Sequence, residues 1–173
     1  MRRFLALALL VLLWRPIHAS DGDIQTILAE LAEITGWKAT RTIRQESMDR
    51  DGLRRYLEKR MREAVKPKDL RAEELTLKKF GFVPRDFDLR KTTIDLLTEQ
   101  AAAFYDYRKK KLFLLSWSPS AMEQSLLVHE LAHALADQHV HLERFIQRES
   151  NDDGAIARMA VMEGQASWLM AEH

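Results

Sequence analysis

Residues 126–139, Leu-Leu-Val-His-Glu-Leu-Ala-His-Ala-Leu-Ala-Asp-Gln-His, are the segment that most constrains the fold. Apolar side chains fill most of its positions, and this is typical of a helix buried in a protein core. The same segment carries His129, Glu130 and His133. Buried ionisable groups are costly unless they are paired or bind a metal ion. The fold must therefore supply partners for these three side chains.

The spacing of the three residues indicates a metal site. Residues four apart lie on one face of a helix, so both imidazoles of His129-Glu130-x-x-His133 can reach one ion. Glu130 projects beside them and is the candidate catalytic base, because it can accept a proton from a metal-bound water. Neutral imidazoles suit Zn²⁺, and a catalytic zinc site takes three protein ligands and keeps one position open. The alternative interpretation is a metal-free helix with half-buried, hydrogen-bonded histidines.

Two residues compete as the third ligand. His139 has the spacing of the longer H-E-x-x-H-x-x-G-x-x-H motif, but Ala136 replaces the glycine at which that motif breaks its helix. Glu163 lies in a second expected helix, on a face whose other members, Ala160, Gly164 and Ser167, are small. The first helix also has small spacers, so the two helices can approach closely. Glu163 is therefore preferred, and the mid-helix Gly164 is expected to have a packing or functional reason.

The composition fits one ordinary globular domain. The chain has 173 residues, of which 46% are hydrophobic and 31% charged. The absence of cysteine excludes disulfides, thiolate zinc sites and a cysteine nucleophile. The formal net charge of +1 gives no sign of nucleic-acid binding, so no nucleic-acid partner is expected.

The N-terminal residues 1–19 have the pattern of a secretory signal peptide. Arg2 and Arg3 precede the apolar run Phe4 to Trp14, and Ala19 precedes the expected cleavage point. The run is short for a membrane span, although an uncleaved N-terminal anchor remains the alternative. Removing residues 1–19 leaves 24 basic and 26 acidic side chains, a net charge of −2. We expect an exported protein, periplasmic or secreted from a bacterium, with no stable membrane insertion after cleavage.

The remaining periodicity predicts a mainly helical α+β domain over residues 20–173. A hairpin of two strands is expected directly before the metal-binding helix, around the basic turn 107–110. Ser118-Pro119 is a favourable start for that helix, which should end near Asp137. Helices are predicted over 24–34, from a cap at Ser47 to Pro67, over 70–80, over 89–97 and over 151–168; strands are predicted over 101–106 and 111–116, with a weaker one over 40–45.

These residues resemble a zincin metallopeptidase, in particular a gluzincin, in which a glutamate on a following helix is the third zinc ligand. The sequence is also similar to uncharacterised bacterial proteins with V-H-E-L-x-H-A-L-x-D-Q-H and E-G-x-A stretches, here Val128 to His139 and Glu163 to Ala166. The resemblance implies a zincin-like fold with a small antiparallel sheet. It also implies that a hairpin strand, near Phe104-Tyr105 or 111–116, pairs with an extended substrate.

The chain departs from the gluzincin pattern in two places. An aspartate often follows the ligand glutamate by four residues, but Ser167 stands there. The fold usually continues into a lower subdomain that supplies an oxyanion donor, whereas this sequence stops at His173. The C-terminal subdomain is therefore expected to be short or missing, with His173 or Tyr105 as substitute donors. Asp137 is a candidate partner for a ligand histidine, or else a helix-end acid.

The expected function is that of an exported zinc-dependent hydrolase, most simply a metallopeptidase. His129, His133 and Glu163 would hold Zn²⁺, and Glu130 would activate the bound water for attack on a peptide or protein substrate. The alternative is a non-catalytic envelope protein that keeps the fold and the metal. Substrate specificity and oligomeric state do not follow from the sequence.

Overall fold

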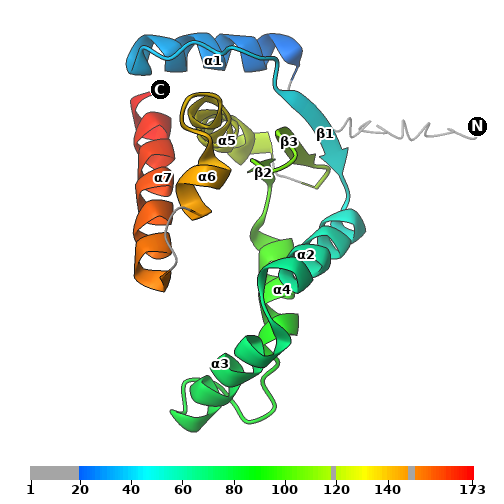
Figure 1. Ribbon diagram of the computed structural model, residues 1–173. Coiled ribbons are helices and arrows are strands. Elements are labelled where there is room, and N and C mark those ends of the chain that lie inside the picture. Colours follow the sequence, from blue (N-terminus) through cyan, green and yellow to red (C-terminus); the bar gives the residue numbers. More distant parts are fainter. Residues whose placement is uncertain (1–19, 118–119, 148–150) are drawn as a thin grey trace, which may run out of the picture.

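The computed structural model describes residues 20–117, 120–147 and 151–173 (Figure 1). The expected signal peptide 1–19 and the expected helix start at Ser118-Pro119 lie outside the described residues. The described chain is mainly helical with one small sheet, as the α+β prediction required. Its elements are α1 (Asp21–Thr35), β1 (Arg44–Met48), α2 (Arg50–Ala64), α3 (Pro67–Lys79), α4 (Leu89–Gln100), β2 (Ala103–Asp106), β3 (Lys111–Leu115), α5 (Ser120–Val140), α6 (Leu142–Gln147) and α7 (Asp152–Glu172).

The sheet has three strands in the order β1-β3-β2. The predicted hairpin is confirmed, because β2 pairs antiparallel with β3, with Phe104 opposite Phe113. The expectation of a purely antiparallel sheet is wrong, since β1 pairs parallel with β3 and makes the sheet mixed. Parallel neighbours need a long crossover connection, which α2, α3 and α4 provide here.

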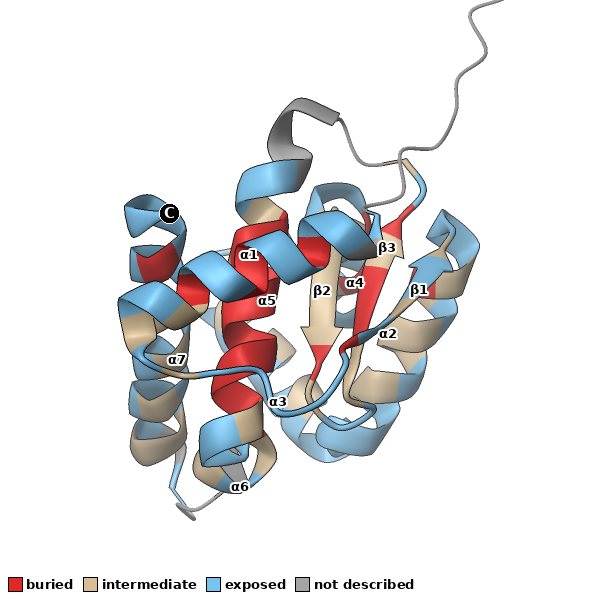
Figure 2. Cartoon of the chain, turned by 90° about the horizontal axis from the view of Figure 1, so that it is seen from above, coloured by how far each residue is buried: buried red, intermediate tan, exposed pale blue. Residues whose placement is uncertain are grey.

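Helix α5 lies at the centre of the main body, beside α1, α7 and the sheet (Figures 1 and 2). Figure 2 shows that the buried positions concentrate along this helix. Residues 130–137 of α5 are all buried, which satisfies the apolar pattern from which the helix was predicted. The core consists mainly of apolar side chains from these elements: Ile24, Ile27, Leu28, Leu31, Leu112, Leu127, Val128, Leu131, Leu135, Ala166 and Leu169.

Several helices begin or end at residues other than the predicted ones, because a neighbouring residue provides the cap or the first turn. Asp49, and not Ser47, caps α2 by accepting a hydrogen bond from the Gly52 N–H, while Ser47 belongs to β1. Pro67 is the first residue of α3, where its missing N–H costs nothing. Gly36 closes α1 as predicted, in the left-handed conformation with φ 73°. The short helix α6 was not predicted.

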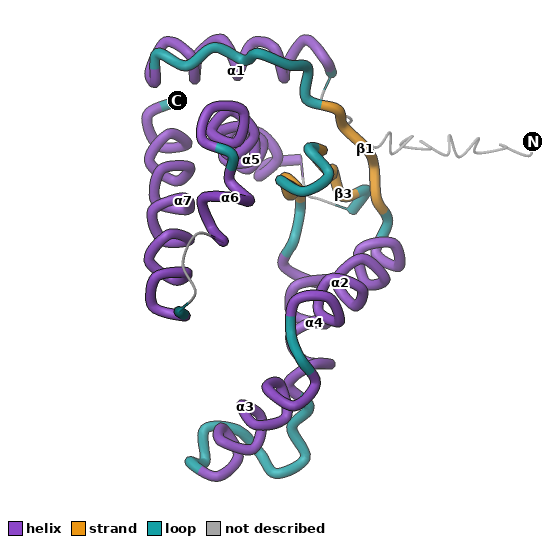
Figure 3. Tube along the Cα trace, viewed as in Figure 1, coloured by secondary structure: helices purple, strands orange, loops and turns teal. Residues whose placement is uncertain are grey.

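Helices α2, α3 and α4 extend away from the main body (Figure 3). The far end of this extension is formed by α3 and the turn that follows it, as Figure 1 shows. None of the helices in the described ranges is long and apolar enough to cross a membrane.

The packing of α1 on α5 can be tested with Leu31→Ala, because the Leu31 side chain is fully buried in the core. We expect the free energy of unfolding to fall by about 2–5 kcal/mol through lost burial and a residual cavity. Leu96→Ala removes the same atoms from an exposed position, so its effect should stay within about 0.5 kcal/mol. Urea denaturation of both variants makes the comparison, and equal effects would contradict this core.

Candidate metal centre

The structure brings His129, His133 and Glu163 together at the contact between α5 and α7. The Nε2 atom of His129 lies 3.1 Å from Nε2 of His133 and 3.2 Å from Oε2 of Glu163. The third side of this triangle, from His133 Nε2 to Glu163 Oε2, is 3.4 Å. The three predicted ligands therefore present one atom each to a common point, and together they can hold a metal ion.

The spacing of these three atoms fits tetrahedral coordination. Bonds of about 2.0–2.1 Å to nitrogen or oxygen in a tetrahedron place neighbouring ligand atoms about 3.3–3.4 Å apart. The observed sides of 3.1, 3.2 and 3.4 Å are close to that value. The two imidazole rings meet edge to face, with an interplanar angle of 88°, so their nitrogen atoms converge while the rings do not stack.

The histidines and the glutamate differ in exposure. His133 is buried and His129 is partly buried, whereas the Glu163 side chain is 55% exposed. Burial lowers the pKa of His133, although the nearby Glu163 carboxylate opposes this shift. The neutral imidazole is the form that binds a metal ion. The group is thus anchored in the core on one side and open to solvent on the other.

Helix α7 does not pack on α5 through the face of small residues that the sequence predicted. Ala160, Gly164 and Ser167 are exposed, and a Cβ atom added to Gly164 would meet nothing within 4 Å. Among the side chains of α7 that the structure describes, the buried ones are Ala166 and Leu169. The helix is therefore turned so that Glu163 reaches the histidines from the margin of the contact, and Gly164 has no packing role.

Glu130 is buried beside the histidines and is held by the sheet. Its Oε2 atom accepts a hydrogen bond of 2.6 Å from the Tyr105 backbone N–H on β2. Burial raises the pKa of Glu130 to about 7, with a smaller contribution from the Glu163 charge, while the Tyr105 hydrogen bond opposes the rise. A carboxyl group with this pKa can exchange protons near neutral pH.

Asp137 does not contact the histidines, so the helix-end interpretation of this residue is the correct one. Its fully buried carboxylate accepts hydrogen bonds from the Tyr105 hydroxyl (2.8 Å), the Lys110 ammonium (2.7 Å) and the Leu142 backbone N–H (2.9 Å). It thereby fixes the hairpin and the start of α6 to α5. Sequence reasoning missed Tyr105 and Lys110 as its partners, because nothing in the local sequence marks contacts across about 30 residues.

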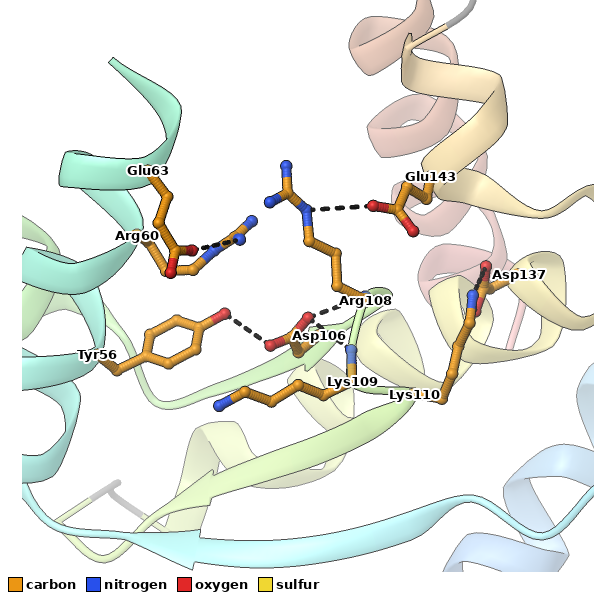
Figure 4. Close-up of polar contacts among 9 residues, drawn as sticks. All are labelled: Tyr56, Arg60, Glu63, Asp106, Arg108, Lys109, Lys110, Asp137 and Glu143. Atoms are coloured by element: carbon orange, nitrogen blue, oxygen red, sulfur yellow. Dashed lines mark hydrogen bonds and ion pairs between the residues drawn. The ribbon is translucent and has the colours of Figure 1, made fainter. Parts of the chain in front are cut away.

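The basic turn between β2 and β3 is tied to the surrounding helices, as Figure 4 shows. Asp106 accepts hydrogen bonds from the Arg108 and Lys109 backbone N–H groups and from the Tyr56 hydroxyl of α2. Arg108 reaches Glu143 of α6 at 3.5 Å, and Lys110 reaches Asp137 (Figure 4). These contacts fix the hairpin that carries the Tyr105 N–H.

The other histidines considered at the site lie elsewhere. His139 stacks on Trp37 at 5.1 Å between ring centroids, and its Nε2 atom lies 3.0 Å from the Lys38 carbonyl oxygen. The Nε2 atom of His173 contacts the Glu30 carboxylate of α1. The structure therefore places neither of them with His129 and His133, and the Tyr105 hydroxyl is engaged by Asp137.

Comparison with known proteins gives no match: no family model, no curated protein and no solved structure is significantly similar to this chain.

The raised pKa of Glu130 predicts a pH-dependent stability of the metal-free protein. Between about pH 4.5 and 7 the unfolded carboxyl loses its proton while the folded one keeps it, so stability falls as pH rises. This pH-dependent loss is absent from Glu130→Gln. As pH rises from about 4.5 to 7, the free energy of unfolding of the variant minus that of wild type should therefore increase by about 3 kcal/mol. Denaturation at several pH values measures the difference. A difference independent of pH would contradict the buried, protonated state.

Proposed function

We propose that the protein is a zinc-dependent hydrolase, and more specifically a metallopeptidase of the gluzincin type. The observation that carries the proposal is the triangle of His129, His133 and Glu163 ligand atoms with sides of 3.1–3.4 Å. Glu130, next to His129 in sequence, supplies the buried carboxyl group that such chemistry needs. These are the four residues that H-E-x-x-H and a downstream glutamate single out in the sequence.

Zinc is the metal that this donor set favours. The chain has no cysteine, so a site here offers only imidazole and carboxylate ligands. Two histidines and one glutamate are a known ligand set of catalytic zinc, which leaves a fourth position for water. When bound, zinc makes that water acidic near neutral pH and polarises a substrate carbonyl.

The chain's own contribution to the reaction is proton transfer by Glu130. The Tyr105 N–H holds one carboxylate oxygen, and burial raises the pKa of Glu130 in the metal-free protein. Glu130 would take a proton from the attacking water and deliver it to the leaving amine of the cleaved peptide.

The outer edge of β2 pairs with no further strand in the described residues, although Glu130 of α5 covers it at Tyr105, and this edge favours an extended peptide as substrate. In an antiparallel pair, the N–H and C=O groups of alternate residues point toward the partner strand. The Leu115 N–H donates to the Ala102 carbonyl, so the N–H and C=O groups of Ala103 and Tyr105 point away from β3. The Tyr105 N–H is taken by Glu130, while the Ala103 N–H and both carbonyl oxygens face the outer edge. An extended chain can add to such an edge as a further strand. We propose that this happens outside the cytoplasm, with residues 1–19 as the export signal.

One observation favours the alternative of a non-catalytic metal-binding protein. Both residues considered as oxyanion donors are engaged elsewhere, Tyr105 with Asp137 and His173 with Glu30. Polarisation of the carbonyl would then rest on the metal alone. The activity experiment below separates the two functions.

Zinc binding is tested by titrating metal-free protein and its variants. Glu163→Ala removes a direct ligand, so its affinity for Zn²⁺ should fall by about 100-fold or more, which exceeds the usual loss on changing an outer partner. His139→Ala is the matched control and should bind zinc as wild type does. Loss of affinity on the His139 change with no effect at Glu163 would overturn the ligand assignment.

Catalysis is tested with the zinc-loaded protein on a pool of unfolded proteins. Glu130→Ala should retain zinc and lose about 10²–10⁴-fold in peptide cleavage, because general acid–base transfer is removed. Mass spectrometry of the products gives the rate, and metal analysis of the same samples confirms the zinc content. If zinc-loaded wild type releases no peptides, the non-catalytic function is the correct one.

A further inference from the structure

Tyr105 of β2 is bonded to α5 through both its backbone and its side chain. The backbone N–H donates to Oε2 of Glu130 at 2.6 Å, and the hydroxyl donates to Oδ2 of Asp137 at 2.8 Å. Glu130 and Asp137 are seven residues apart, which is two helical turns or about 10 Å along one face of α5. One residue of the sheet therefore links the candidate base to a second carboxylate of the same helix.

The ladder of the sheet does not hold the Tyr105 N–H against Glu130. This N–H points away from β3, and no strand pairs with that edge of β2 in the part of the chain that the structure describes. β2 is only four residues long, so its own pairing does little to fix its distance from α5. The bond from the Tyr105 hydroxyl to Asp137 ties the strand to the helix through the same residue that carries the N–H.

The Asp137 carboxylate is a fixed point for that bond. The side chain is fully buried, and its two oxygen atoms accept hydrogen bonds from three partners. Besides the Tyr105 hydroxyl, these are the Lys110 ammonium, at 2.7 and 2.8 Å, and the Leu142 backbone N–H, at 2.9 Å; Figure 4 shows the contact with Lys110. A carboxylate has about four lone-pair sites, and all of them are used here. Asp137 is therefore held in one orientation.

The cation that balances Asp137 comes from a strained position in the turn. Lys110 has φ 55°, in the left-handed region that favours glycine. A buried carboxylate without a cation would be costly, and Lys110 supplies the charge. Backbone strain of this kind often accompanies a functional contact. Here that contact keeps Asp137 charged and able to accept from Tyr105.

We propose that Asp137 is a positioning residue for Glu130 and acts through Tyr105. By holding the hydroxyl, Asp137 sets where the Tyr105 N–H lies, and this N–H fixes one oxygen of the Glu130 carboxylate. The other oxygen is left for proton transfer, which requires the group to be held within about 0.5 Å of its working position. The inference rests on the proposed function, in which Glu130 moves the proton.

The Tyr105 hydroxyl is the point at which this role can be tested while the buried Asp137 and its other partners stay in place. Tyr105→Phe removes only that hydroxyl. Tyr56→Phe is the matched control, because the Tyr56 hydroxyl donates to Asp106 of the same strand at 2.9 Å (Figure 4). Both tyrosines are partly buried, so the two variants lose the same atom from similar surroundings.

Peptide cleavage by the zinc-loaded variants should separate the two tyrosines. For Tyr105→Phe, kcat should fall by about 10- to 100-fold because the base is misplaced. KM and the affinity for Zn²⁺ should not change, since no ligand and no substrate contact is removed. For Tyr56→Phe, kcat should stay within about twofold of wild type. Lys110→Arg keeps a cation that can pair with the carboxylate and should retain kcat.

Amide hydrogen exchange of the metal-free protein, followed by NMR, gives a readout that does not depend on activity. The protection factor of the residue 105 amide should fall by about tenfold or more in Tyr105→Phe. The Leu115 amide, which bonds to the Ala102 carbonyl within the hairpin, should keep its protection. A merely structural role would lower the protection of both amides alike and leave kcat unchanged.

The outcomes distinguish this role from the proposed function. If wild type cleaves peptides and Tyr105→Phe has the same kcat, or if Tyr56→Phe loses as much, the role of Asp137 is overturned and the proposed function stands. Unchanged protection at residue 105 would also overturn the role. If zinc-loaded wild type cleaves nothing, the proposed function fails, and the catalytic role of Asp137 fails with it.

Discussion

The burial of α5 is the constraint on which the rest of the structure depends. The helix lies between α1, α7 and the sheet, and its buried stretch includes Glu130, His133 and Asp137. Each of these groups would destabilise the fold if it were left without a partner. The surrounding elements are placed so that each group has one.

These partners tie separate parts of the chain to one helix. β2 supplies the Tyr105 N–H for Glu130, and the hairpin supplies the Tyr105 hydroxyl and Lys110 for Asp137. α7 brings Glu163 to the histidines. The loop before β1 is fixed in the same way, since the Gln138 side chain accepts from the Thr40 and Arg41 N–H groups and donates to the Arg41 carbonyl. The polar positions of α5 thus organise both the site and the fold around it.

Much of this arrangement follows from local sequence patterns. Helical periodicity and capping residues predicted α1, α4, α5 and α7 within a few residues, and the turn between β2 and β3 predicted the hairpin. Register and long-range contacts were not predictable in this way. β1 pairs with a strand 67 residues later, Arg44 opposite Lys111, and its weak alternation placed it too early. Glu163 was predicted as a ligand, but the argument from Gly164 and its small neighbours was wrong, because they face solvent.

X-ray absorption spectroscopy of the zinc-loaded protein tests the central claim most directly. The account predicts a first shell of nitrogen and oxygen atoms at about 2.0–2.2 Å, with scattering from two imidazole rings and none from a third. A shell with three imidazoles would point to a further histidine in place of Glu163. A shell without imidazole would contradict the site formed by α5 and α7.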